Sequence, residues 1–293
     1  MPAGRVTRAG PETPLDDAAL VALPAAFAAL VAILGTLAVE RFGGRVGGIL
    51  HTVPTTIVPA SVGMWFAKHD VAAFEAAMAA VPLGMLVDAA FLWMWRALPR
   101  RLPAWSLGAR LATMIVTSLS VWFLGAFVLV QALASAGGSD PRRLGAAGLA
   151  VTAGIGIGSC VYGHPSPKGS RRPAAWMIAS RGVLAATAIA VCVWIAHHGQ
   201  PVASGLASAF PAMFLTTMVS LWIAQGEAVP TGAVGPMILG STSVGTYSLI
   251  ASWALPTLGV WLGVPLAWVA SVACTSVPAG LWLTRWSAEA RRA

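Results

Sequence analysis

The sequence is constrained above all by apolar runs of about 20 residues that recur along almost its whole length. A run of that length can cross the hydrocarbon core of a bilayer as an α-helix. Only 10% of the 293 residues are charged, against about 25% in a soluble domain. The runs do not alternate between apolar and polar residues, which excludes an outer-membrane β-barrel. We therefore predict an all-α, polytopic integral membrane protein whose first partner is the lipid bilayer.

The apolar runs predict about nine transmembrane helices. They cover residues 18–39, 46–67, 71–95, 111–133, 144–162, 174–196, 204–224, 229–250 and 258–283. Residues 1–17 form a polar N-terminal tail that contains three prolines, and residues 285–293 form a basic C-terminal tail. These boundaries predict a helical bundle with short connecting loops.

Basic residues gather in the short segments between these runs and give a formal net charge of +8. Cytoplasmic loops are enriched in Lys and Arg, so topology explains the charge without a nucleic-acid partner. With nine spans, the clusters at residues 96–110, 168–172 and 285–292 fall on one side. We expect that side to be cytoplasmic, with the N-terminus outside, in the inner membrane of a bacterium. Arg142 and Arg143 are the main exception, and one re-entrant segment in place of a span would reverse the orientation.

Two apolar segments interrupted by glycine and proline, residues 40–65 and 225–247, resemble each other. Matching residues are separated by a constant step of 182 (236 − 54): Gly44 and Gly226, Pro54 and Pro236, Ser61 and Ser243, Trp65 and Tyr247. The match predicts an internal repeat made of residues 18–95 and 204–284, joined by a membrane block, residues 96–203. Paired segments of this kind indicate a solute site between two repeats. Chance similarity between two glycine-rich apolar stretches is the alternative.

The first of these segments carries the pattern G-G-R-x-G-G-x-L followed by proline. Its residues are Gly43, Gly44, Arg45, Gly47, Gly48, Leu50 and Pro54. The pattern resembles a motif of uncharacterised bacterial membrane proteins built from two halves, and single halves resemble the small GlpM-like membrane proteins. The second half departs from the pattern, because Glu227 replaces the arginine and Val229 and Pro230 replace the second glycine pair. The resemblance implies a two-half membrane protein and no particular activity.

Asp88 is the strongest candidate for a functional side chain, because it lies well inside the third apolar run. A charged side chain at the centre of a membrane costs about 2.5–3.5 kcal/mol, so one that is kept faces a cavity or a partner. Asp88 could bind a coupling proton or ion, or it could be hydrogen-bonded within the bundle for a structural purpose. Glu75 lies at the start of the same run on a different helical face, which predicts a position at the lipid interface.

Pro54 and Pro236 are predicted to open the backbone of the second and eighth spans, because proline removes a backbone donor. Polar side chains near these prolines could line the opening; they are His51, Thr52, Thr55, Thr56 and Ser243. The alternatives are a histidine that only packs and hydroxyl groups that bond back to their own helix. Together with Asp88 these residues form the predicted substrate or ion pathway.

The sequence contains no motif of an enzyme, cofactor site or metal site. Gly154, Gly156 and Gly158 lack the spacing of a dinucleotide-binding loop, and close helix packing explains them better. Cys160, Cys192 and Cys274 lie far apart in apolar runs and have no metal-ligand spacing. We therefore predict no enzymatic activity and no cofactor.

Together these features predict a gradient-driven transporter or exporter of a small solute, with a site near the membrane midplane between broken helices. The alternative is a non-transporting membrane subunit or scaffold of a larger complex, in which Asp88 pairs with a partner chain or with Arg181. A homo-oligomer or a membrane complex partner is compatible with both readings.

Overall fold

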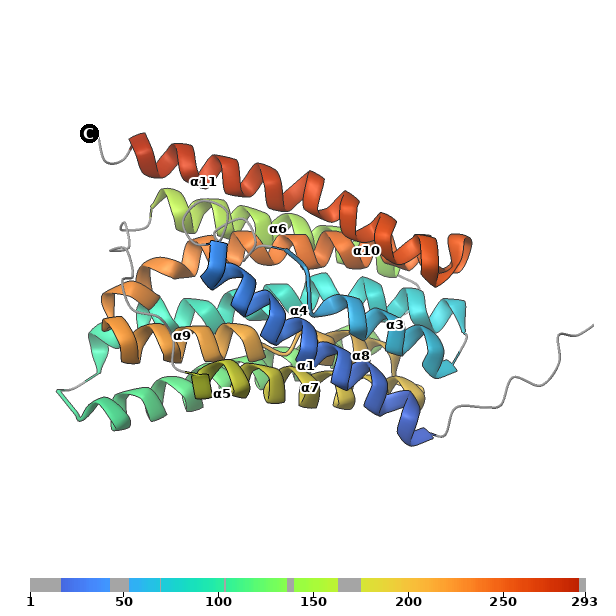
Figure 1. Ribbon diagram of the computed structural model, residues 1–293, viewed down its shortest axis with the longest axis horizontal. Coiled ribbons are helices and arrows are strands. Elements are labelled where there is room, and N and C mark those ends of the chain that lie inside the picture. The colour runs from blue at the N-terminus through green and yellow to red at the C-terminus, as the bar shows by residue number, and fades with distance from the viewer. Residues whose placement is uncertain are drawn as a thin grey trace, which may run out of the picture.

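The computed structural model describes residues 17–42, 53–68, 70–102, 104–135, 140–162 and 175–289, and every regular element in these ranges is a helix. The elements are α1 (Asp17–Phe42), α3 (Ile57–Lys68), α4 (Val71–Ala97), η1 (Pro99–Arg101), α5 (Leu107–Ser135), α6 (Pro141–Val161), α7 (Ala175–His197), α8 (Pro201–Ser208), α9 (Ala212–Gln225), α10 (Ala228–Ser271), η2 (Val272–Ser276) and α11 (Val277–Glu289). The long helices lie side by side along the longest axis of the molecule (Figure 1). This arrangement confirms the predicted all-α bundle.

Six helical stretches within the described ranges are long and apolar enough to cross a membrane. They are Val71–Arg101, Leu107–Ser135, Pro141–Val161, Ala175–His197, Pro201–Gln225 and Ala228–Arg285. Two shorter apolar helices, Ala18–Leu34 and Ile57–Ala67, coincide with the first and second predicted spans. The six stretches indicate a membrane protein, whereas the number of nine spans and the internal repeat remain predictions.

The longest stretch reverses direction at Gly259. This residue has a φ of +74°, in the left-handed region that glycine enters without steric cost. Beyond it the chain runs back along the bundle towards the C-terminus (Figure 1), and Gly263 lies against the backbone of Ala254. Residues 228–258 and the part from 260 onwards therefore correspond to the eighth and ninth predicted spans.

The predicted break at Pro236 is absent, because α10 continues through this proline with helical geometry. One proline removes a single backbone donor, whereas ending a helix leaves about four unsatisfied groups on each side. In an apolar environment the continuous helix is the cheaper solution. The backbone is instead interrupted between α8 and α9, at residues 209–211, and before α3, where residues 53–56 are not helical.

The central helix is α4, which packs against α5, α6, α8 and α10. Its contacts with α6 and α8 depend on glycine: a Cβ added at Gly145 or Gly205 would fall 2.6 Å or less from the carbonyl oxygens of Ala79 and Ala77. Small residues allow membrane helices to approach this closely, and dispersion forces then hold them together. The glycines of α6 and α8 therefore allow these helices to pack closely against α4 and bury it.

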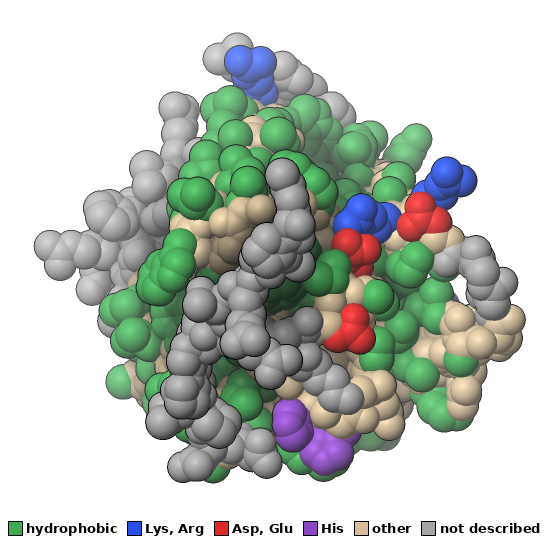
Figure 2. Space-filling model, turned by 90° about the vertical axis from the view of Figure 1, so that its right-hand side faces the viewer, with side chains coloured by type: hydrophobic (Ala, Val, Ile, Leu, Met, Phe, Trp, Pro, Cys, Tyr) green, Lys and Arg blue, Asp and Glu red, His purple; other side chains and the backbone are tan. Residues whose placement is uncertain are grey.

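The two ends of the bundle differ in charge. We name them after Glu75, near which α4 and α6 begin, and Glu227, near which α5 and α10 begin. At the Glu75 end, acidic, basic and histidine side chains stand among hydrophobic surface (Figure 2). Arg142 Nη2 lies 2.6 Å from Glu75 Oε1, and Arg143 Nε lies 3.4 Å from Asp140 Oδ2. Each arginine described at this end therefore has its own acidic partner.

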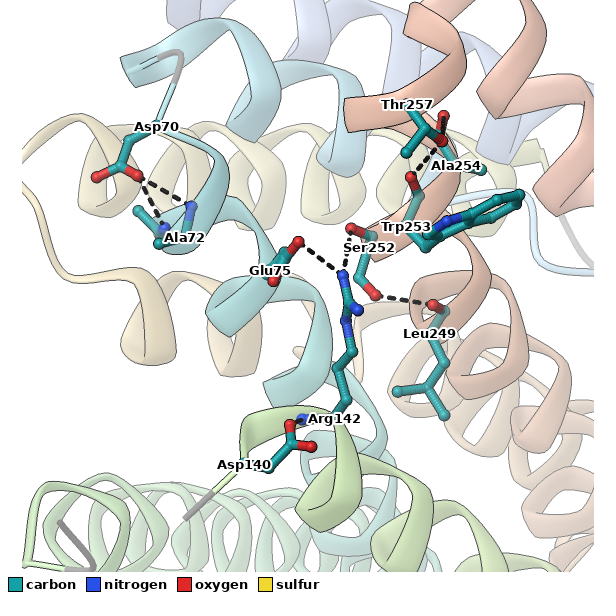
Figure 3. A network of polar contacts seen from close by, with 11 residues as sticks. Asp70, Ala72, Glu75, Asp140, Arg142, Leu249, Ser252, Trp253, Ala254 and Thr257 are labelled. Carbon is teal, nitrogen blue, oxygen red and sulfur yellow. Dashed lines mark hydrogen bonds and ion pairs between the residues drawn. The ribbon is translucent and has the colours of Figure 1, made fainter. Parts of the chain in front are cut away.

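The pair of Arg142 and Glu75 ties three helices together (Figure 3). The Arg142 guanidinium also donates to the carbonyl of Ser252 on α10, at 3.5 Å. Asp70 caps the start of α4 by accepting hydrogen bonds from the amides of Ala72 and Ala73. Glu75 thus lies at one end of the bundle, in agreement with its predicted position at the start of the third apolar run.

Candidate functional site

Asp88 lies inside the bundle, nine residues before the end of α4 and therefore about 14 Å from it along the helix axis. The residue is 1% exposed, and neither carboxyl oxygen has a hydrogen-bond partner among the residues that the structure describes. The indole N–H of Trp122 on α5 approaches the carboxyl closely enough to interact with it, but it makes no hydrogen bond of normal geometry. The structure therefore buries an acid with no bond to offset its desolvation.

The interruption between α8 and α9 lies next to this acid. The ring of Phe210, which belongs to the interruption, packs edge-on against Trp122 with 5.2 Å between centroids. One turn before Asp88, Gly84 faces Ala209, and a Cβ added to Gly84 would lie 2.5 Å from the Ala209 side chain. Two independent contacts thus place the broken helix at the level of Asp88, on the side where Trp122 covers it.

The part of α10 before Gly259 runs antiparallel to α4 in a constant register. Thr231 Oγ1 donates to the carbonyl of Trp95, and Gly245 packs against Pro82. Residues 236–243 of α10 are therefore level with Asp88, within about one helical turn on either side. Pro236 and Ser243 lie at the two ends of this segment, and Ser243 Oγ donates back to the carbonyl of Gly240.

Three of the five predicted residues of the second span are described, and they lie apart from this site. His51 and Thr52 lie outside the described residues. Pro54 is buried, and Thr55 and Thr56 are partly buried, in the non-helical segment before α3. α3 packs mainly against α1, α7 and α10, and no contact that the structure gives for Pro54, Thr55 or Thr56 reaches Asp88. Of the predicted pathway residues, Pro236 and Ser243 lie on the α10 segment that is level with Asp88, whereas Pro54, Thr55 and Thr56 do not.

The alternative partner of Asp88, Arg181, forms no ion pair with it among the described residues. Arg181 is buried in α7, and the neighbouring Gly182 packs against Ile33 of α1. Its helix contacts α1, α3, α8 and α9. The two buried charges thus belong to different parts of the bundle.

The two segments whose similarity predicts a repeat meet elsewhere in the structure. Ser61 Oγ and Tyr247 Oη lie 2.8 Å apart in a fully buried hydrogen bond between α3 and α10. Ser61 belongs to the first of these segments and Tyr247 to the second. This contact joins the segments whose similarity suggested a repeat, at a point closer to the Glu75 end than Asp88.

Sequence reasoning missed the residues that cover Asp88. Neither Trp122 nor Phe210 was singled out as a candidate from the sequence. Pro211, inside the seventh predicted span, was the available signal for a break. The ion pair of Arg110 with Glu227 was also missed, although both residues stand at the start of a span and on the same side of the membrane.

The structure also places the glycines of α6 and the three cysteines. Gly156 packs against the backbone of Leu239 on α10, as close helix packing requires, whereas a Cβ at Gly154 or Gly158 would meet nothing within 4 Å. The cysteines are free thiols, and the described residues contain no group of three potential metal ligands.

No protein-family model, no curated protein and no solved structure matches this chain. The resemblance to two-half and GlpM-like membrane proteins therefore stays a prediction from sequence.

Proposed function

We propose that this protein is a gradient-driven transporter or exporter of a small solute, and that Asp88 binds and releases the coupling proton or cation. The observation that carries the proposal is the burial of Asp88, whose carboxyl oxygens find no hydrogen-bond partner within the described part of the chain. An ionised carboxylate in apolar surroundings is unfavourable, and a proton or a small cation neutralises it. Binding of a proton or cation therefore stabilises the buried Asp88, and its release leaves an unfavourable buried charge. A side chain with this property is suited to ion coupling.

The interruption between α8 and α9 supports the same site. Half-helix ends have backbone groups without helical partners, and in transporters such ends bind ions and solutes near the midplane. Phe210 and Ala209 bring this interruption to Asp88. We therefore place the solute site between α4, α5 and the interruption, with residues 236–243 of α10 at the same level. The proposed pathway thus uses the seventh span rather than a break at Pro236.

The charge distribution supports an orientation within the membrane. Basic residues of the Glu227 end, such as Arg96, Arg100 and Arg101, outnumber the acidic residue described there, Glu227. At the Glu75 end, Arg142 and Arg143 are both neutralised by acids. Under the positive-inside rule the Glu227 end is cytoplasmic, which suits the inner membrane of a bacterium. Arg142 and Arg143 stay an exception to this orientation, because the rule counts Lys and Arg and acidic partners contribute little.

The test is ion flux through purified protein in liposomes. A pH-sensitive dye and a sodium-sensitive dye inside the vesicles report proton and sodium entry under an imposed gradient. We expect Asp88→Asn to abolish the flux and to leave insertion and folding intact. Asp70→Asn is the matched control, because it changes another acid of the same helix region and asparagine also caps helices well. Equal flux in wild type and Asp88→Asn would exclude the coupling role.

A non-transporting subunit is the second candidate, and the surface after Gly259 favours it. Trp261 is 92% exposed and Leu262 66% exposed. Such apolar surface meets lipid in a protein that acts alone and meets another chain in a subunit. Recovery of the protein as a stable complex with a second chain, and no flux in either wild type or Asp88→Asn, would favour the subunit.

A further inference from the structure

We propose that α5 is a lid over Asp88, and that the ion pair of Arg110 and Glu227 latches this lid shut. The lid deepens the transport function proposed above and rests on it, because it describes how the coupling ion reaches Asp88. Figure 1 shows α5 at the edge of the bundle, on the side away from α6. Such a place allows a helix to move without displacing the rest of the fold.

α5 is attached by one narrow stripe of side chains. Its buried residues are Leu111, Met114, Ser118, Trp122 and Ala126, which recur at helical spacing on one face. The opposite face is open, with Val116 64% and Leu124 65% exposed. The helix contacts α4 along this stripe and α8 more lightly. Trp122, the residue that covers Asp88, belongs to the stripe, so outward movement of α5 would uncover the carboxyl.

Polar contacts hold α5 at the Glu227 end. Arg110 Nη2 lies 2.5 Å from Glu227 Oε2 and 3.3 Å from the carbonyl oxygen of Pro99. The pair joins the start of α5 to Glu227, the residue that directly precedes α10. Breaking this pair would therefore remove an ionic contact that holds the start of α5 against the start of α10.

Arg110 also packs against the aromatic side chains that lie between Asp88 and the Glu227 end of the bundle. The Arg110 guanidinium lies over the ring of Trp222, 5.6 Å from its centroid. Trp222 in turn packs edge-on against Trp95 of α4, at 5.8 Å. Trp95 stands two turns beyond Asp88 on α4. Release of Arg110 thus frees the side chains that separate Asp88 from this end.

The latch is weak enough to open. The side chains of Arg110 and Glu227 are 23% and 32% exposed, so water screens part of their attraction. Arg110 lies twelve residues before Trp122, or about 18 Å along α5. A small outward rotation at the latch would therefore be transmitted along a stiff helix to the residue that covers the acid.

The test measures access to Asp88 by a water-soluble carbodiimide, which modifies carboxyl groups, with quantification by peptide mass spectrometry. In Arg110→Gln and Glu227→Gln we expect Asp88 to be modified roughly two to five times faster than in wild type. The charge-reversed double variant Arg110→Glu/Glu227→Arg should return the rate towards wild type. Arg142→Gln breaks the ion pair at the Glu75 end, which does not hold α5, and should leave the Asp88 rate unchanged.

A disulfide provides a second test that does not depend on weakening the fold. In Arg110→Cys/Glu227→Cys, oxidation should slow modification of Asp88 and ion flux together, and reduction should restore both. An unchanged rate at Asp88 in the two Gln variants and in the oxidised disulfide variant would overturn the lid. Loss of flux in Asp88→Asn with no effect of the latch would overturn the lid and keep the transport function. If the modification rate of Asp88 depended on the latch but no ion flux were found, the lid would be supported and the transport function would be overturned.

Discussion

Two glycines of α6 that stand two residues apart allow a sharp test of the bundle around Asp88. Gly154 and Gly156 lie in the same helix, but on different faces. A Cβ added to Gly156 would lie 2.8 Å from the backbone N and Cα of Leu239, whereas one added to Gly154 would have nothing within 4 Å. Leu239 belongs to the α10 segment that is level with Asp88. Gly156→Ala therefore pushes α6 and α10 apart at the site, and Gly154→Ala is its matched control.

The size of the effect follows from these distances. Replacing glycine by alanine in a helix stabilises it by up to ~1 kcal/mol, and this gain is shared by both variants. At Gly156 the new methyl group meets backbone atoms, which cannot rotate away as a flexible side chain would. Overpacking of this kind costs about 1–3 kcal/mol. Because the shared gain cancels, we expect Gly156→Ala to be about 1–3 kcal/mol less stable than Gly154→Ala.

The assay is reversible unfolding of the purified protein in mixed micelles of increasing denaturing detergent, followed by circular dichroism. The free energy of unfolding of each variant is compared with that of wild type. Gly154→Ala should unfold at the same detergent fraction as wild type or at a higher one, and Gly156→Ala at a lower one. If the two variants had equal stability, the close packing of α6 against α10 at Leu239 would be refuted.

Two further predictions test other parts of the structure. Tyr247→Phe removes the buried hydrogen bond to Ser61 and should destabilise the protein by ~0.6–1.7 kcal/mol in the same unfolding assay; Ser61→Ala should cost a similar amount, and the double variant much less than the sum of both. For the orientation, a cysteine at Arg100 should react with a membrane-impermeant thiol reagent only in permeabilised cells, and one at His198 already in intact cells; the reverse pattern would place the Glu227 end outside.

The helices could be predicted from the sequence because hydropathy alone determines which segments leave water. All nine predicted runs contain helix within their described residues, and the boundaries of α4 and α7 agree closely with the prediction. The predicted break at Pro236 was wrong, since a single lost donor does not end a helix in apolar surroundings. The reversal at Gly259 was within reach of sequence reasoning, but nothing in the sequence shows which glycine adopts a positive φ.

The candidate site was predictable in one residue and not in its surroundings. Asp88 could be singled out because an acid inside an apolar run is costly wherever its helix packs. Its neighbours Trp122 and Phe210 come from segments 34 and 122 positions away in the chain (122 − 88 and 210 − 88). Their meeting depends on how α5 and α8 pack against α4, which hydropathy does not encode. The hydrogen bond between Ser61 and Tyr247 likewise shows that the two similar segments are in contact, which their sequences alone did not show.

The paired charges at the Glu75 end have a consequence for how the protein enters a membrane. A membrane potential does electrical work of about 2.3 kcal/mol per elementary charge for each 100 mV. In a membrane that is negative inside, an unaccompanied arginine would have to be moved outwards against this field. Arg142 with Glu75 and Arg143 with Asp140 carry no net charge as pairs, so the field does almost no work when they cross together. In the orientation proposed above, the arginines of the outer end would travel as neutral units, and those of the inner end would stay where the field holds them.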